Sequence, residues 1–370
     1  MKVTREQVLA YRIEAQGLHR EASSVTRLAV LDIGVQDSVA DGARLAFDAR
    51  LPATPPVGGV GPGSPLALVW SLRGAPHVHR RRDLDALAAA LWPLSDADAG
   101  ARMNQSGPHL AAAKLGGLEG FVASVDALES VLAAPTTKGA VSTALTPKVH
   151  EAFTSYCRVC KATHVSDSVL RAAALAAGVE LEPDTAPPVL LPRANARHPR
   201  TNDPRALGQL ISAYLSLLGP ASPAEVAGYL QARRAEIAAL WPADLAEVTV
   251  DGRLAWLPAG QLPALRAPRP PELVRLLSPF DPYLQARDRD LIVADRAAHK
   301  ALWPILGRPG VLLVAGEVAG LWRARSRGRT LALSIETFGP IPAPDWSRIE
   351  AEAARIGAVR GAADVSVTRS

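Results

Sequence analysis

The chain has 370 residues, 48% of them hydrophobic, and a formal net charge of +5 at pH 7. This length exceeds one ordinary hydrophobic core, so we expect two or three domains. Two cysteines argue against a disulfide framework. No apolar run reaches the roughly 18 residues of a membrane span, and the charged N-terminus lacks the apolar stretch of a signal peptide. We therefore expect a cytoplasmic protein with no membrane partner, and we expect a monomer because nothing in the sequence demands a partner chain.

The first informative segment is LDIGVQDSVADGARLAFDAR, residues 31–50, which places Gln36 and Asp37 between two apolar runs. Asp37 or Ser38 could cap the helix that ADGARLAF predicts, because short polar side chains satisfy the first amides of a helix. Alternatively, Gln36 and Asp37 face a cleft and carry chemistry.

The segment RGAPHVHRRRD, residues 73–83, concentrates imidazoles and cations. It places His77 and His79 on the same side of an extended stretch, followed by Arg80 and Arg81. A metal site would need further ligands that the neighbouring sequence does not supply. The segment indicates contact with DNA phosphate or a pocket wall, with an ordinary surface turn as the alternative, and these four residues are candidate DNA-binding residues.

Two segments align without gaps, LAAPTTKGAVSTAL at 132–145 and LLGPASPAEVAGYL at 217–230. Each follows a helix-forming run and has a Pro-containing turn, a hydroxyl residue and a second helix. In the second copy Ser222, Pro223 and Glu225 form a full capping-box signature. We therefore predict one supersecondary unit used twice.

The second copy continues into a third helix, QARRAEIAALW, and into LAEVTVDGRLAWLP, where Asp251-Gly252 predicts a tight hairpin turn. Three helices and a hairpin form the winged-helix arrangement, which most often binds nucleic acid and sometimes serves protein contacts. Residues 166–182 predict a helix and a short strand that could belong to a third, degenerate unit. Residues 183–199, rich in Pro, predict an extended linker.

The segment CRVCKATH contains Cys157, Cys160 and His164. A closed structural zinc site needs four ligands, and the chain has no second cysteine pair, so we expect a packing cluster and no metal. The sequence also has no P-loop, no dinucleotide glycine fingerprint and no Gly-x-Ser-x-Gly elbow. We expect no cofactor.

After residue 270 the sequence predicts strands in LIVADR, PGVLLVAGEVAGLWRAR and RTLALSIETF, then a final helix. Candidate DNA-binding arginines occupy every second position in WRARSRGRT: Arg323, Arg325, Arg327 and Arg329. A turn at Ser326-Arg327-Gly328 would crowd their guanidinium groups at one hairpin tip. Such a tip suits phosphates or a narrow minor groove. Alternatively, the charges only protect a solvated hairpin from edge pairing.

These elements predict an α+β protein with tandem winged-helix units and a small β-rich C-terminal domain. We expect a first winged-helix unit and the candidate catalytic segment in 1–150, a degenerate middle unit and linker in 151–200, a winged helix with the Asp-Gly wing in 201–270, and the β-rich domain with the arginine hairpin and terminal helix in 271–370.

The chain resembles the winged-helix family of the bacterial AlkZ and YcaQ DNA glycosylases. The resemblance rests on RGAPHVHRR, APTTKGAVSTALT, YCRVCKATHV, LLGPASPAEVAGYL, DGRLAWLP, LLSPFDPYLQARDR and ALWPILGRPGVLLVAGEVAGLWRAR, which run in family order. It implies tandem winged helices with a β-rich tail, and excision of N7-alkylated purines, interstrand crosslinks included, from double-stranded DNA.

The catalytic motif of this family is Gln-Φ-Gln or Gln-Φ-Asp, with Φ an apolar residue. Gly34-Val35-Gln36 occupies it here, so Gln36 stands at the second polar position and Gly34 replaces the first Gln. The resemblance implies that Gln36 orients a water molecule and that Asp37 supplies negative charge to an oxocarbenium-like sugar. An N7-alkylated purine is already cationic and leaves without strong protonation.

Two functions from different classes follow. The first is a DNA glycosylase for N7-alkylated purines or crosslinks, acting in general alkylation repair or in self-resistance at the nucleoid. The alternative is a non-catalytic winged-helix DNA-binding or regulatory protein, which the missing first Gln favours. Tandem wings in one chain argue against a dimeric repressor. A protein-interaction scaffold is a third reading, and strongly salt-dependent DNA affinity would count against it.

Overall fold

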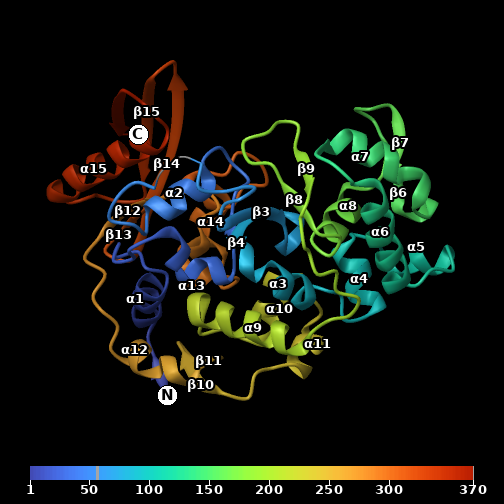
Figure 1. The fold of residues 1–370 in the computed structure, drawn as a ribbon. Coiled ribbons are helices and arrows are strands. Elements are labelled where there is room, and N and C mark those ends of the chain that lie inside the picture. Colours follow the sequence, from blue (N-terminus) through green and yellow to red (C-terminus); the bar gives the residue numbers. More distant parts are fainter. Residues whose placement is uncertain (56–57, 370) are drawn as a thin grey trace. The chain divides into compact units, whose positions relative to one another are not determined.

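The computed structural model describes residues 1–55 and 58–369 and shows an α+β protein with several separate sheets (Figure 1). Two compact units can be distinguished. The first comprises Met1–Val57, Ser212–Glu225 and Ala243–Ser370, and the second comprises Gly58–Ile211 and Val226–Pro242. Each unit therefore gathers segments that are far apart in the sequence.

The first unit contains a 3-stranded sheet of order β1-β10-β11 and a 5-stranded sheet of order β12-β13-β14-β15-β16. Its elements are β1 (Lys2–Val3), α1 (Arg5–Ala15), β2 (Val35–Gln36), α2 (Gly42–Asp48), β10 (Leu245–Val250), β11 (Arg253–Pro258), α12 (Leu262–Arg266), β12 (Val274–Leu277), α13 (Arg289–Ile292), α14 (Arg296–Leu302), β13 (Gly310–Val314), β14 (Glu317–Arg327), β15 (Thr330–Thr337), α15 (Ala343–Val359) and β16 (Asp364–Arg369).

The 5-stranded sheet packs one face against α15. Trp322 of β14 and Leu333 and Ile335 of β15 form a core with Ile349 and Ile356 of the helix. Because side chains alternate along a strand, the residues between these core positions lie on the opposite face. That face of β14 carries the arginines considered below.

The segment LIVADR, predicted as a strand, instead contains the end of α13 and the start of α14. Residues 289–292 form α13, and α14 begins at Arg296. The reason is local, because the Asp295 side chain accepts a hydrogen bond from the Ala297 amide at 2.9 Å and so caps α14. The strands predicted further along correspond to β13, β14 and β15, and the predicted terminal helix corresponds to α15.

Two buried ion pairs join distant segments of the first unit. Arg12 of α1 pairs with Asp288, with 2.6 Å between Nη2 and Oδ2. Arg50, just beyond α2, pairs with Asp281 at 2.8 Å, and both side chains are 0% exposed. Both carboxylates belong to the segment between β12 and α13, so that segment is tied to the N-terminal helices.

The second unit contains strands that lie side by side in the order β4, β3, β8, β9 and β5, and a hairpin of β6 and β7. Its elements are β3 (Leu66–Trp70), β4 (Pro76–Arg80), α3 (Leu84–Ala90), α4 (Asp96–Arg102), α5 (Gly107–Ala112), α6 (Gly117–Val131), β5 (Thr136–Thr137), α7 (Lys138–Leu145), β6 (Thr154–Cys157), β7 (Ala162–Val165), α8 (Asp167–Ala174), β8 (Val179–Leu181), β9 (Val189–Pro192) and α11 (Arg234–Ala239). Two helices, α9 (Pro204–Leu218) and α10 (Pro223–Leu230), contribute residues to both units.

The predicted sequence repeat corresponds to a repeat of elements. Thr137 caps α7 by accepting from the Ala140 amide, and Ser222 caps α10 by accepting from the Glu225 amide, each at 3.4 Å. The residue before each cap pairs with a strand of a hairpin: Thr136 lies opposite Leu190 of β9, and Ala221 lies opposite Trp256 of β11. Both copies therefore join a helix, a short bridge, a second helix and a hairpin.

The predicted turn at Asp251-Gly252 and the predicted linker have different outcomes. The turn at Asp251-Gly252 is confirmed, because both residues have positive φ and Val250 pairs with Arg253. The predicted linker 183–199 is wrong over β9, whose Leu190 and Leu191 are buried. Apolar side chains that a sheet can bury outweigh the neighbouring prolines there.

Within residues 1–55 and 58–369, no helix combines the length and apolar character that crossing a membrane requires.

Candidate functional site

Gln36 and Asp37 lie at the end of β2 with both side chains held in place. Gln36 is 8% exposed, and its Nε2 donates a hydrogen bond to the Ser38 hydroxyl at 2.8 Å. Asp37 Oδ1 accepts from the Ala43 amide in the first turn of α2 at 2.9 Å. Asp41 occupies the N-cap position, but its carboxylate pairs with Arg44 at 2.9 Å. Asp37 therefore caps the helix from four residues further back, and its negative charge faces the helix N-terminus.

Gly34, which we expect at the first polar position of the motif, has φ of +77°. This is the left-handed region, which a residue with a Cβ enters only at a cost of roughly 1–2 kcal/mol. The glycine at this position therefore suits the backbone that leads into β2.

The segment after Asp37 opens directly onto a cleft in the first unit. The cleft has a volume of about 220 Å³, and Val39 and Ala40 form part of its wall. Three arginines from distant segments line it as well: Arg308, Arg323 and Arg360. Cationic side chains that converge on an open cleft suit an anionic ligand such as phosphate.

Neighbouring groups position each of these three arginines. The guanidinium of Arg308 lies 4.5 Å from the centre of the Phe280 ring. Arg323 Nη1 donates to the Gly307 carbonyl at 2.8 Å, and Arg360 Nε lies 3.7 Å from Asp41 Oδ2. The side chains are thus arranged around the cleft before any ligand arrives.

Strand β14 extends from this cleft to the tip of the arginine hairpin. Arg323, Arg325 and Arg327 are exposed and share one face of the strand, opposite the face that carries Trp322. The predicted turn is shifted: Arg327 pairs with Thr330, so the turn is Gly328-Arg329 and not Ser326-Arg327-Gly328.

The shift has a physical reason and a consequence. Gly328 has φ of +58°, a conformation that glycine adopts at no steric cost. It therefore takes the first turn position, and Arg327 stays in the strand. The arginine row starts at the cleft and ends at exposed Arg329 in the turn.

His77 and His79 lie in the second unit on one side of β4, as predicted, but they are buried, at 1% and 2% exposed. The Ser71 hydroxyl lies 3.1 Å from His77 Nδ1 and 3.0 Å from His79 Nε2. His77 Nδ1 also donates to the Ala75 carbonyl at 2.9 Å. Burial, together with the charges of Arg73 and His79, holds the pKa of His77 well below its usual value. His77 is therefore a neutral hydrogen-bonding group.

Arg80 and Arg81 are anchored within the second unit. Arg80 is 8% exposed and pairs with Asp83 at 3.4 Å. Arg81 pairs with Glu180 of β8 and donates through Nε to the Ser64 carbonyl at 2.8 Å. These contacts join β4 to β8 and to the loop that leads into β3.

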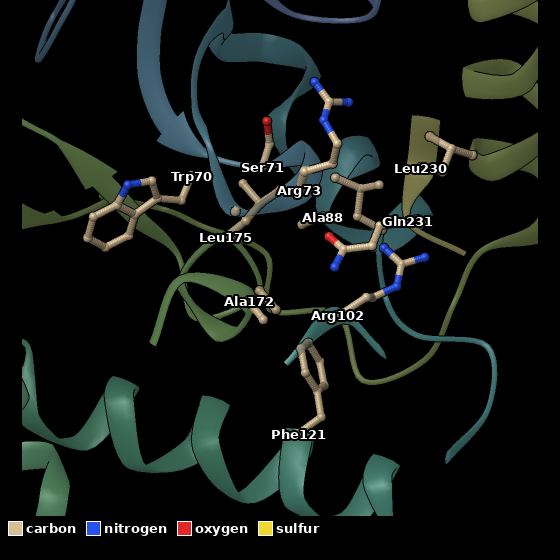
Figure 2. Close-up of a pocket in the computed structure, with 13 residues that line it drawn as sticks. Trp70, Ser71, Arg73, Ala88, Arg102, Phe121, Ala172, Leu175, Leu230 and Gln231 are labelled. Carbon is tan, nitrogen blue, oxygen red and sulfur yellow. The ribbon is translucent and has the colours of Figure 1, made fainter. Parts of the chain in front are cut away.

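The same unit has a small cavity, and Ser71, whose hydroxyl contacts both histidines, is one of the residues that line it (Figure 2). Its polar lining comes from Ser71, Arg73, Arg102 and Gln231, and Trp70 belongs to its apolar lining. Its volume of about 40 Å³ has room for roughly three water molecules. No residue of HVHRR lines this cavity, and sequence reasoning missed Arg102 and Gln231 because they are distant in the chain.

Cys157, Cys160 and His164 come together at the end of the β6–β7 hairpin. Their ligand atoms all lie within 4.8 Å of one another. Hydrogen bonds to the Cys157 sulfur, from the Cys160 amide first and then from the His164 side chain, lower the pKa of that thiol to about 6. Within the described part of the chain this is the group of His, Cys, Asp and Glu side chains able to hold a metal ion.

Known proteins resemble this one along nearly its whole length. A family model described as DNA glycosylase AlkZ-like matches residues 25–359, which include Gln36, Asp37 and the hairpin arginines. The solved structure of Streptomyces sahachiroi DNA glycosylase AlkZ is similar with a TM-score of 0.75 at 20% sequence identity, and the match covers 100% of each chain. Among curated protein sequences, none matches. At this identity the structural match shows a shared fold.

Proposed function

This chain belongs to the AlkZ-like family of DNA glycosylases, and on that premise we propose that it hydrolyses the N-glycosidic bond of N7-alkylated purines, crosslinked ones included, in double-stranded DNA. The observation that carries the proposal is the continuity of the segment after Gln36 and Asp37 with the cleft of Arg308, Arg323 and Arg360. A polar pair beside a cationic cleft can act on a sugar while arginines bind the flanking phosphates.

The chemistry divides between two side chains. The hydrogen bond to Ser38 fixes the Gln36 amide, so its carbonyl can orient the attacking water. Asp37 supplies negative charge to the oxocarbenium-like sugar while its Oδ1 holds the first turn of α2. The alkylated purine leaves with its electron pair and becomes neutral, so the site needs no strong general acid.

The β14–β15 hairpin binds the DNA backbone. Arg325, Arg327 and Arg329 are exposed and continue the row that begins at Arg323. His77 and His79 are buried, and Arg80 and Arg81 are held by ion pairs. These four residues therefore contribute to DNA binding indirectly, because they position neighbouring residues of the second unit. An enzyme with this substrate works at the nucleoid, as a monomer with a complete site in one chain.

We further propose that both element repeats are winged helices. The second comprises α9, α10 and α11 with the wing β10–β11, and the first comprises α6, α7 and α8 with the wing β8–β9. On this reading α8 and β8–β9 complete the first copy, and the β6–β7 hairpin is an insertion between its second and third helices.

A non-catalytic DNA-binding protein is the second candidate, favoured by Gly34 at the first motif position. Base release from a duplex with N7-methylguanine separates the two. We expect release by the wild type and a loss of roughly 100-fold in Gln36→Ala, with Gln105→Ala in the second unit as the control. Binding without release would establish the second candidate, and neither binding nor release would refute both.

A further inference from the structure

We propose that Cys157, Cys160 and His164 bind a zinc ion at the end of the β6–β7 hairpin, with solvent in the fourth position. Two thiolates and an imidazole form a ligand set that zinc prefers and that magnesium, calcium and manganese do not. The site is independent of the glycosylase chemistry proposed above, because it uses none of the same residues.

The spacing of the ligand atoms fits zinc. A tetrahedral ion with Zn–S bonds of about 2.3 Å and Zn–N bonds of about 2.0 Å separates its ligand atoms by roughly 3.4–3.8 Å. The two sulfurs and the imidazole nitrogen lie within 4.8 Å of one another, so an inward movement of roughly 1 Å completes the geometry.

The turn between the strands holds the first sulfur as a metal ligand requires. The amides of Val159 and Cys160 both hydrogen-bond the Cys157 sulfur, which stabilises negative charge on it. Lys161 has φ of +52°, so the chain reverses directly after the second cysteine. This left-handed conformation is uncommon for a residue with a Cβ.

The imidazole is oriented in the same way. His164 Nδ1 lies 2.9 Å from the Val165 carbonyl, which can only accept, so Nδ1 carries the proton. The His164 side chain also hydrogen-bonds the Cys157 sulfur, which places Nε2 beside that sulfur, and a metal ion bound there would displace the Nε2 proton. A ligating histidine commonly donates its second N–H to a backbone carbonyl in this manner.

The hairpin also has a structural need for a metal. Its base is packed, because Phe153 and Val165 are each 1% exposed. Its far end is not, because Tyr156 is 65% exposed and Val159 is 91% exposed. A two-stranded hairpin without a buried face is marginally stable. Zinc would join Cys157 on β6 to His164 on β7 and supply the missing cross-link.

The test uses the full chain, stripped with chelator under reducing conditions and then titrated with zinc against a chromophoric chelator. We expect one zinc per chain, and at least a tenfold loss of affinity in Cys157→Ser, Cys160→Ser and His164→Asn. His198→Asn, which replaces a surface histidine of the same unit, is the control. Cobalt should give the thiolate-to-metal charge-transfer absorption of a tetrahedral site.

Proteolysis gives a second readout, because Arg158 and Lys161 lie in the turn. Zinc should slow tryptic cleavage there in the wild type and in His198→Asn, and not in the ligand variants. Zinc retained by a Cys157→Ser/Cys160→Ser double variant would overturn the proposal. So would a Cys157–Cys160 disulfide that persists with excess zinc, or an octahedral cobalt spectrum without charge-transfer bands.

Discussion

The carboxylate of Asp37 accepts a hydrogen bond from the backbone N–H of Ala43, with 2.9 Å between Oδ1 and the nitrogen. The two functions that the sequence suggested for Asp37, a helix cap and a charge at the active site, are therefore compatible in one side chain. One oxygen holds the first turn of α2, and Val39, two residues further along the chain, lies in the wall of the cleft.

Substitutions at Asp37 separate the cap from the charge. Asp37→Asn keeps a carbonyl oxygen for the Ala43 amide, so we expect a stability within a few tenths of a kcal/mol of wild type but a loss of base release. Asp37→Ala removes both functions and should also lower the free energy of unfolding by about 1 kcal/mol. Urea denaturation and base release on the same samples distinguish the two. Full activity of Asp37→Asn would show that Asp37 serves only as the helix cap.

Gly34 should tolerate a side chain poorly. Because φ is +77°, Gly34→Gln should cost about 1–2 kcal/mol of unfolding free energy even though it restores the glutamine that we propose for the first motif position. Gly208→Ala is the control, because this glycine lies within α9 with open space around it, and alanine should stabilise the helix by about 0.5–1 kcal/mol. A Gly34→Gln variant as stable as wild type would show that the backbone adapts.

The arginine hairpin should determine the salt dependence of DNA binding. Arg325→Ala and Arg327→Ala each remove one guanidinium that we propose binds a phosphate, so each should reduce the slope of log K against log salt concentration by about 0.9. Arg348→Ala on α15 is the control, because its side chain is 58% exposed and lies outside the hairpin. Fluorescence anisotropy over a salt series measures the slope. An equal reduction in the control would mean that the effect reflects net charge alone.

Local chemistry was predictable from the sequence. The Ser222-Pro223-Glu225 signature does begin α10, and Asp251-Gly252 does close β10 onto β11. Both depend on neighbouring residues, whose preferences for caps and turns hold in most surroundings. The shared side of His77 and His79 follows from strand periodicity in the same way.

Relationships between distant segments were not predictable. Arg308 and Arg360 join the cleft only because the loop before β13 and the end of α15 meet beside Val39. Strand β16 was not predicted, because its side chains are largely exposed and it forms a strand only by pairing with β15. The burial of His77 also depends on its surroundings, since a sheet covered on both faces hides either side of β4.

The buried pair of Arg50 and Asp281 should be the more sensitive of two comparable ion pairs. Arg50→Met leaves a buried carboxylate without its guanidinium, which should lower the free energy of unfolding by about 3–5 kcal/mol. In the control, Arg44→Met, the pair with Asp41 is 25% exposed on both sides, and the loss should stay below about 1 kcal/mol. Similar losses in both variants would show that packing of the side-chain stem dominates.

His77 should make folding sensitive to acid. Burial first, then the charges of Arg73 and His79, hold its pKa well below the ordinary value of 6.5 in the folded chain. Between 6.5 and the lowered pKa the unfolded chain binds a proton that the folded chain does not, so the stabilising contribution is complete above 6.5 and is lost as the pH falls through this window. His77→Gln removes the titration and should flatten the pH dependence of the unfolding free energy.

Arg73→Met provides the graded test of the same idea. It removes one of the two charges that disfavour protonated His77 and leaves the burial in place, so the acid loss should shrink without disappearing. Urea denaturation at a series of pH values on the three proteins gives the slopes. If wild type and His77→Gln lose stability equally on acidification, other groups control the acid response, and the neutral state of His77 has no measurable part in it.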